Sequence, residues 1–212
     1  MNEAPKELPL RERKKLRTRQ ALVDTALELF TARDFATVTL DEIVDAVEVS
    51  KRTFFRVFTS KEDVALAPEK ELWAAYLADI ESRPLTAEHL LAAYEDALFA
   101  ALEHMADGWE RRFLASRSLA DRTPALTAHS LRHCSEVSAG VVRITSDRLA
   151  GGSPGRVEVR LLLDLMLGAW HCALEAWTAP DTAERDRAAL VRHMRRAFSA
   201  IPAVAALAAR QG

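Results

Sequence analysis

Basic residues crowd the N-terminal part of this 212-residue sequence. Between positions 11 and 19, six of them face a single acid, Glu12; they are Arg11, Arg13, Lys14, Lys15, Arg17 and Arg19. Such a density of positive charge suits contacts with the phosphates of a polyanion. The alternative is a solvated helix start or tail, because charge runs often cover a wet face.

A second group of polar and basic side chains lies between positions 50 and 56. Arg52 has the planar fork that can read guanine bidentately, while the hydroxyls of Ser50 and Thr53 can donate to phosphates or base edges. Lys51 and Arg56 add two positive charges. These residue types at this spacing indicate a surface for double-stranded DNA.

A third group could in principle support metal or catalytic chemistry. His129 and His133 stand four residues apart, which places two ring nitrogens on one helix face, and Cys134 follows directly. No third ligand is evident, and His133 falls on an apolar stripe, so a core or pocket histidine is the simpler interpretation. We therefore expect no metal, no cofactor and no catalytic residue.

Two short helices must position the residues at 50 to 56. An apolar stripe predicts a first helix from Leu16 to about Ala32. Thr39 followed by Glu42 has the spacing of a capping box, which predicts a helix over about 40–47. Ser50 can cap a third helix over about 51–57.

The last two of these helices form the pattern of a helix-turn-helix, in which the second helix enters the major groove. We expect Phe54 and Phe58 to pack in the core beneath it. This spacing is typical of a DNA-binding bundle.

Three segments carry a resemblance to a known family. They are Val38-Thr39-Leu40-Asp41-Glu42-Ile43-Val44, Val49-Ser50-Lys51-Arg52-Thr53-Phe54-Phe55-Arg56-Val57-Phe58 and Lys61-Glu62-Asp63. They resemble the tetracycline-repressor-like (TetR) family of bacterial regulators. The chain departs from the family pattern at the turn glycine, which is Glu48, and at the family's Tyr and His, which are Phe55 and Val57. A left-handed residue with a Cβ costs roughly 1 kcal/mol or more, so we expect a slightly different turn.

The motif residues and the basic start together give the predicted DNA-binding set. Phosphate contacts fall to Thr39, Arg56, Lys61 and the basic arm, and Phe55 is left with apolar contact to sugar or thymine methyl. The complete set is Arg17, Thr39, Ser50, Lys51, Arg52, Thr53, Phe55, Arg56 and Lys61.

The whole chain reads as all-α, with about nine helices. Few glycines, no recurrent hairpin turns and further apolar stripes support this fold class. We expect a DNA-binding domain over residues 1–60 with its basic N-terminal arm, and a helical effector-binding and dimerisation domain over residues 61–212. The longest apolar run is interrupted by charged residues, and two distant cysteines suggest no disulfide scaffold, so we expect no membrane segment and a cytoplasmic location.

Two helices near the C-terminus are expected to form a homodimer. A helix over 156–178 is apolar on two faces around Gly168 and Trp170, and one over 182–206 is its natural companion. TetR-like proteins dimerise in this region, whereas a buried central helix of a monomer is the alternative.

Aromatic side chains in the second domain suggest an apolar or amphipathic effector. For each of these residues, core packing is the alternative. The set is Trp73, Tyr76, Phe99, Leu102, Met105, Trp109, Phe113, His133 and Trp170. The resemblance implies that such an effector shifts the helix bearing Trp73 and Tyr76.

The leading hypothesis is a DNA-binding transcriptional regulator, acting as a repressor that a small, largely apolar effector releases from its operator. One alternative is a helical enzyme or metal-binding protein that uses His129, His133 and Cys134. The other is a helical interaction module whose basic arm binds an acidic partner or a membrane surface. In either alternative, the residues from Ser50 to Thr53 need have no role.

Overall fold

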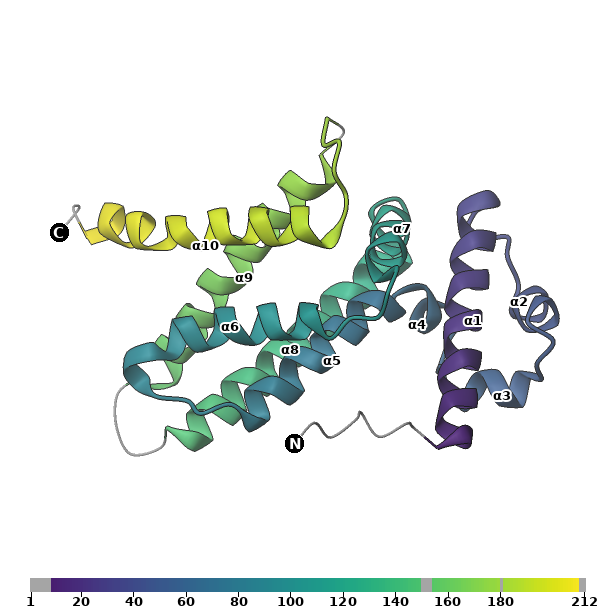
Figure 1. Ribbon diagram of the computed structural model, residues 1–212, viewed down its shortest axis with the longest axis horizontal. Coiled ribbons are helices and arrows are strands. Elements are labelled where there is room, and N and C mark those ends of the chain that lie inside the picture. Colours follow the sequence, from purple (N-terminus) through teal and green to yellow (C-terminus); the bar gives the residue numbers. More distant parts are fainter. Residues whose placement is uncertain (1–8, 150–153, 180, 210–212) are drawn as a thin grey trace, which may run out of the picture. The chain divides into compact units, whose positions relative to one another are not determined.

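The computed structural model of the chain describes residues 9–149, 154–179 and 181–209. Within these ranges the chain forms α-helices and one short 3-10 turn, without a strand, so the all-α prediction is confirmed (Figure 1). The elements are α1 Leu10–Ala32, α2 Leu40–Ala46, α3 Lys51–Phe55, α4 Lys61–Ala65, α5 Ala67–Ser82, η1 Ala87–His89, α6 Leu90–Glu103, α7 Trp109–Asp121, α8 Pro124–Arg148, α9 Arg156–Thr178 and α10 Arg187–Ala209.

The chain divides into two compact units. The first comprises Met1–Glu69 and Arg111–Ser130, and the second comprises Lys70–Glu110 and Leu131–Gly212. Residues 61–69 and 111–130 therefore pack with the N-terminal helices, beyond the functional boundary expected after residue 60. The assignment of residues 1–60 to DNA binding stays a prediction, and residues 1–8 of that segment lie outside the described ranges.

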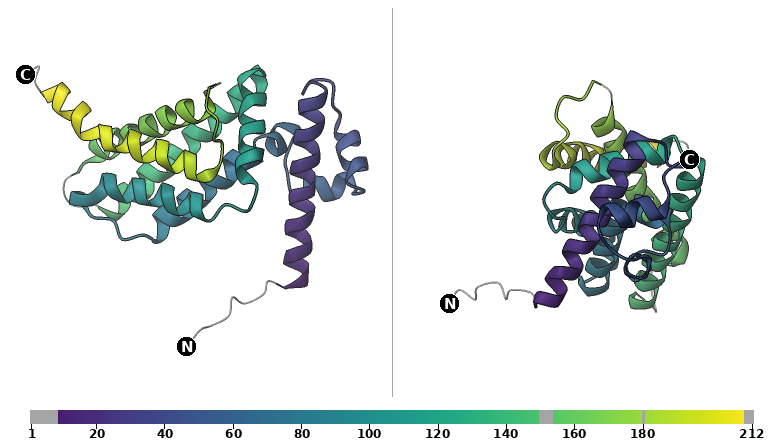
Figure 2. Two further views of the ribbon diagram at one scale, coloured as in Figure 1. Left: turned by 45° about the horizontal axis from the view of Figure 1, so that its top comes forward. Right: turned by 90° about the vertical axis from the view of Figure 1, so that its right-hand side faces the viewer.

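The first unit is built on one apolar core. The face of α1 that points into it carries Leu22, Val23, Ala26, Leu27 and Phe30, whose spacing places them on one side of the helix. α1 packs against α2 and α4, and α2 packs against α3 (Figure 2). The core thus fixes α3 from one side only.

The first helix begins six residues before the predicted start at Leu16. Its first two turns are exposed, and Leu10 and Leu16 are 59% and 52% exposed. No apolar stripe marks these turns in the sequence. They are rich in Leu, Arg, Lys and Glu, which are good helix formers even without burial.

The sequence predicts one helix beginning near Ser60, but the structure has two helices there, α4 and α5, separated at Leu66. Pro68 explains the break, since its nitrogen cannot donate to the carbonyl of Val64 four residues earlier. This break adds one helix to the predicted nine.

In the second unit, α9 and α10 pack along each other, and α6 packs against α9. α10 begins at Arg187 rather than near residue 182. The carboxylate of Asp186 accepts a hydrogen bond of 2.7 Å from the amide of Ala189, which caps the helix start. The residues from Thr182 to Asp186 therefore belong to the preceding loop.

Candidate nucleic-acid interface

The start of α2 is fixed by the capping box that the sequence predicts. The amide of Thr39 donates to the Glu42 carboxylate at 2.8 Å, and the Glu42 amide donates to the Thr39 hydroxyl at 3.3 Å. Arg33 also donates to this carboxylate. The backbone amide of Thr39, with Arg33, lowers the pKa of Glu42 from 4.5 to about 2. The carboxylate is therefore ionised throughout the neutral range.

The turn between α2 and α3 keeps a left-handed residue even though its glycine is replaced. Glu48 has a φ of +56°. Its amide donates to the carbonyl of Asp45 at 3.1 Å, and the amide of Val49 donates to the carbonyl of Val44 at 2.9 Å. These two bonds form a Schellman motif, which closes the end of α2. The expected change of turn therefore does not occur, and Glu48 carries the backbone strain instead.

α3 begins at the predicted cap. The Ser50 hydroxyl accepts a hydrogen bond of 3.1 Å from the amide of Thr53 and lies 3.1 Å from the Thr53 hydroxyl. Phe54 and Phe58 are buried at 0% and 2% exposure, which confirms that they pack in the core. They hold the opposite face of α3 outward.

The outward face of α3 carries most of the predicted base-reading residues. Ser50, Arg52, Thr53, Phe55 and Arg56 line one open hollow of about 470 Å³. Phe55 is 56% exposed, although it is apolar. The sequence placed these five residues in one set, and the structure brings them together.

Two further predicted residues are exposed but do not line this hollow. Lys51 forms an ion pair of 2.6 Å with Asp41 on α2. Arg17 is exposed on α1. The contact between Lys51 and Asp41 joins residues ten positions apart on different helices, so the sequence contained no signal for it.

Lys61 has a different environment from the other predicted phosphate contacts. Its ammonium donates to the carbonyl oxygens of Phe35 at 2.6 Å and Val38 at 2.9 Å. It also lies 4.3 Å from the centroid of the Phe35 ring. Two of its three donors are thus occupied within the first unit, and its contact with phosphate stays a prediction.

The residues predicted to line an effector site lie mainly inside the second unit. The Trp73 ring contacts the Tyr76 and Trp170 rings edge to face, with centroid distances of 5.6 and 6.0 Å. Leu102 and Trp109 are buried, and Phe99, Met105 and His133 are half-buried. Phe113 is also buried, but it belongs to the first unit. Trp73, Tyr76 and Trp170 therefore form the compact part of the predicted set.

One polar atom in this aromatic group lacks a hydrogen-bond partner. The hydroxyl of Tyr76 is fully buried and unpaired. Burial raises its pKa well above 10.0, so it stays a neutral donor. The nearby Tyr94 differs, because its hydroxyl donates to Thr145 at 3.0 Å.

The alternative based on His129, His133 and Cys134 gains no support from the geometry. Across the described ranges, no group of three or more His, Cys, Asp or Glu residues is arranged to hold a metal ion. None of the helices in those ranges is long and apolar enough to cross a membrane.

The chain is all-α, and the second helix of its helix-turn-helix has an exposed outer face over a buried inner one. This arrangement is typical of the class of helix-turn-helix proteins. Residues 22–67 match the family described as bacterial regulatory proteins, tetR family. The matched segment contains α2, the turn and α3. Over these residues the chain is similar to bacterial regulatory proteins of the tetR family.

A curated relative and a solved structure are also similar to this chain. The HTH-type transcriptional regulator TcmR of Streptomyces glaucescens is 42% identical over 144 residues, which cover 66% of this chain and 63% of TcmR. The match thus spans less than two thirds of that relative's length. A structure from Mesorhizobium loti MAFF303099, assigned to the TetR family, shares the fold with a TM-score of 0.51 at 20% identity, covering 90% of this chain and 98% of its own.

Proposed function

We propose that the chain is a DNA-binding transcriptional regulator that acts as a repressor on double-stranded operator DNA. The observation that carries this proposal is the outward face of α3, where Arg52, Thr53 and Arg56 surround an open hollow while Phe54 anchors the helix from behind. The major groove is wide enough to admit an α-helix, and its base edges offer acceptors to such donors. The protein acts by binding, without a catalytic step, in the cytoplasm.

The residues of the interface divide between reading bases and holding the backbone. Arg52 reads guanine, and Phe55 supplies apolar contact to a thymine methyl or a sugar. Further contacts to base edges or phosphates come from α3 and its two caps, through Ser50, Lys51, Thr53 and Arg56. Thr39 and Arg17 contact phosphates from α2 and α1, and Lys61 adds its remaining donor.

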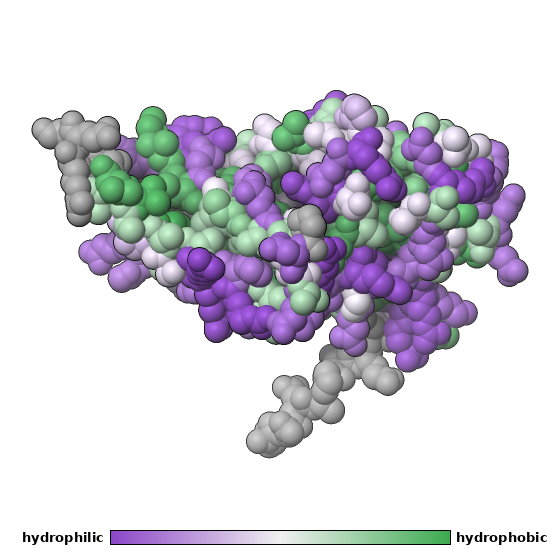
Figure 3. All heavy atoms as spheres, turned by 90° about the horizontal axis from the view of Figure 1, so that it is seen from above, coloured by the Kyte–Doolittle hydropathy of each residue, from purple (hydrophilic) through white to green (hydrophobic). Residues whose placement is uncertain are grey.

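The proposal includes a homodimer formed through α9 and α10. An apolar groove of about 320 Å³ runs between these helices and contains Gly168, Cys172, Ala200 and Val204. A Cβ added at Gly168 would meet nothing within 4 Å. Figure 3 shows hydrophobic residues gathered on the face of α10 near its C-terminal end. A second copy would cover this face. The dimer would then present two recognition helices, one to each half-site of a near-palindromic operator.

Sedimentation tests the dimer through Gly168→Arg, with Ser135→Arg on the exposed face of α8 as the matched control. We expect Gly168→Arg to give monomers or aggregates and Ser135→Arg to leave a dimer. In Gly168→Arg, the affinity for operator DNA should fall far more than the affinity for random DNA. A wild-type protein that is monomeric at micromolar concentration would contradict this part of the proposal.

The effector of the proposed repressor is an apolar or amphipathic small molecule bound in the second unit. The Trp73, Tyr76 and Trp170 rings offer aromatic surface, and the unpaired Tyr76 hydroxyl offers one polar handle. α5 carries Trp73 and Tyr76, so a molecule bound there favours one position of this helix over another. A compound found in a hydrophobic library must stabilise the protein and weaken operator binding together. Stabilisation that leaves operator affinity unchanged would mean that the site does not regulate.

A competition experiment tests the proposed function as a whole. The purified protein is mixed with total genomic fragments, and the retained DNA is sequenced at low and at raised salt. We expect a few fragments to survive raised salt while the bulk is lost, because base contacts add to a salt-sensitive phosphate contribution. Uniform loss of all fragments would leave a protein without sequence preference and would contradict the proposal.

A further inference from the structure

The start of α1 and the end of α3 enclose a second hollow, distinct from the one on the outward face of α3. It has a volume of about 600 Å³ and is lined by Leu10, Arg11, Glu12, Lys14, Lys15, Thr18 and Arg56. The lining thus combines four cationic side chains with one carboxylate. We call this hollow the α1–α3 cleft.

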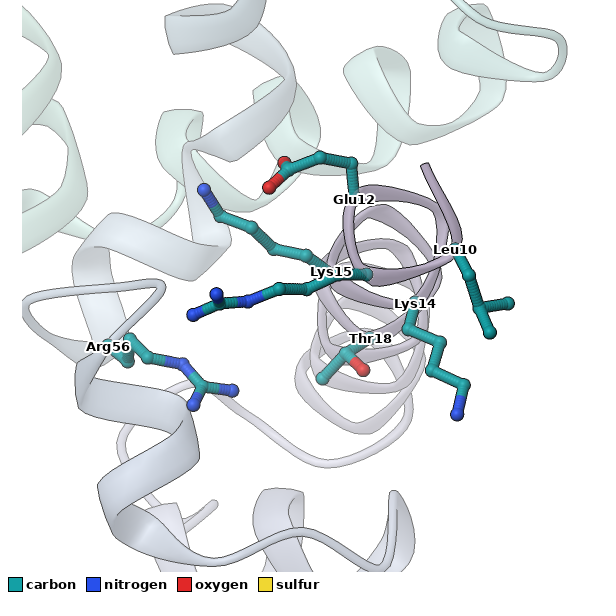
Figure 4. A pocket seen from close by; sticks show the side chains of 7 residues that line it. Leu10, Glu12, Lys14, Lys15, Thr18 and Arg56 are labelled. Carbon is teal, nitrogen blue, oxygen red and sulfur yellow. The ribbon is translucent and has the colours of Figure 1, made fainter. Parts of the chain in front are cut away.

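Cations from two different helices point into the α1–α3 cleft. In Figure 4, the side chain of Lys15 extends from α1 toward α3, and that of Arg56 extends from the α3 side toward α1, whereas Lys14 points away. Neither Lys15 nor Arg56 has an ion-pair partner among the described residues. Two cations that face one space repel each other, and an anion between them removes that repulsion.

The cleft is continuous with the surface that contacts DNA in the proposed function. Arg56 lines both the α1–α3 cleft and the hollow on α3. A helix in the major groove lies between two phosphate backbones, so residues at its flanks face phosphodiesters. The anion nearest to Arg56 in such a complex is therefore a phosphate of the same DNA.

We propose that the α1–α3 cleft binds one phosphodiester of the DNA backbone, held jointly by Lys15 from α1 and Arg56 beside α3. This inference rests on the proposed function and adds a DNA-binding site that includes the first turns of α1. The basic start of α1 then acts as a defined half of a clamp, and not as a diffuse charge. The Thr18 hydroxyl lies in the same lining and can donate to the phosphate.

An anionic membrane is the competing occupant, since Leu10 and Leu16 are exposed beside the basic residues. A membrane surface is contacted by cations that project outward from a helix. Lys15 and Arg56 instead face each other across a cleft, which suits a single bridging anion. The membrane is therefore an outcome for the experiment to distinguish.

A double-mutant cycle tests whether Lys15 and Arg56 share one phosphate. Binding of a fluorescent random-sequence duplex is measured by anisotropy for wild type, Lys15→Ala, Arg56→Ala and the double variant. Arg13→Ala is the matched control, because it removes the same charge from the same helix turn but does not line the cleft. Circular dichroism verifies folding of each variant.

We expect Lys15→Ala and Arg56→Ala each to lower duplex affinity about fivefold to tenfold, and Arg13→Ala by about twofold or less. The double variant should lose roughly as much as one single variant, because either cation loses most of its contribution when the other releases the shared phosphate. Losses that multiply, or an Arg13→Ala loss as large as that of Lys15→Ala, would overturn the clamp while leaving DNA binding intact.

Two further outcomes separate this inference from the proposed function. A wild-type protein that binds no duplex at low salt would contradict the proposed function itself. Vesicles of phosphatidylserine and phosphatidylcholine form a separate arm of the experiment. Vesicle binding that depends on Lys15 and Arg56, with duplex binding that depends on neither, would overturn the phosphodiester assignment in favour of a membrane surface.

Discussion

The ammonium nitrogen of Lys61 lies 4.3 Å from the centroid of the Phe35 ring and 2.6 Å from the carbonyl oxygen of the same residue. A further hydrogen bond of 2.9 Å reaches the carbonyl of Val38, next to the residue that caps α2. The first residue of α4 therefore ties down the segment that leads into the helix-turn-helix. Lys61 thus has a structural role in the first unit, whatever it contacts on DNA.

Lys61→Ala should lower the free energy of unfolding by about 1.5–3 kcal/mol, because hydrogen bonds to a charged group and a cation-π contact are lost together. Urea denaturation measures this change as a lower midpoint. Lys51→Ala is the control, since that lysine makes an exposed ion pair worth little. Unchanged stability in Lys61→Ala, with weaker DNA binding, would make phosphate contact its main role.

Glu48→Gly should raise stability by about 0.5–1 kcal/mol, since glycine adopts a φ of +56° without a Cβ penalty but loses more entropy on folding. Glu48→Ala separates the backbone from the charge, because alanine keeps the Cβ and loses the carboxylate. Its stability should stay close to that of wild type. A gain in Glu48→Ala equal to that in Glu48→Gly would assign the effect to charge instead of strain.

Acid should weaken the capping box at the start of α2 over a definite pH range. The pKa of Glu42 is 4.5 ordinarily and about 2 in the folded chain, so its stabilising contribution is present above pH 4.5 and is lost as the pH falls toward 2. Thermal unfolding between pH 6 and pH 2 measures the loss. Glu42→Gln, which cannot titrate, should show a shallower decline, and parallel curves for the two proteins would contradict the assignment.

Tyr76→Phe and Tyr94→Phe form a matched pair with opposite expected effects on the ligand-free protein. The first removes a buried hydroxyl without a partner and should raise stability by up to about 1 kcal/mol. The second removes a hydrogen bond to buried Thr145 and should cost about 1–2 kcal/mol. Calorimetry measures both. A destabilising Tyr76→Phe would show that its hydroxyl is satisfied in solution.

Local patterns predicted the helix-turn-helix well, because its signals lie within a few residues of each other. The capping box of Thr39 and Glu42, the Ser50 cap and the buried Phe54 all follow from spacing along the chain. The exposed start of α1 was missed, since no apolar stripe marks a helix that projects away from the core. Pro68 is a visible signal for the break between α4 and α5, although the sequence prediction has one helix beginning near Ser60.

Contacts between distant positions could not be predicted from the sequence. Nothing in the sequence links Lys61 to the carbonyl of Phe35, or Lys51 to Asp41, because each pair meets only after the helices have packed. The left-handed Glu48 is a similar case. Its residue type argues against a positive φ, and the hydrogen bonds that close α2 impose one.

The most direct test of the account is the effect of Arg52→Ala on two DNA duplexes of equal length. One carries the fragment retained at raised salt in the genomic competition, and the other has a random sequence. We expect Arg52→Ala to lose about 1–3 kcal/mol of binding free energy on the retained fragment and much less on random DNA, because Arg52 lines the exposed hollow of α3 and reads a base. Equal losses on both duplexes would contradict sequence reading by α3.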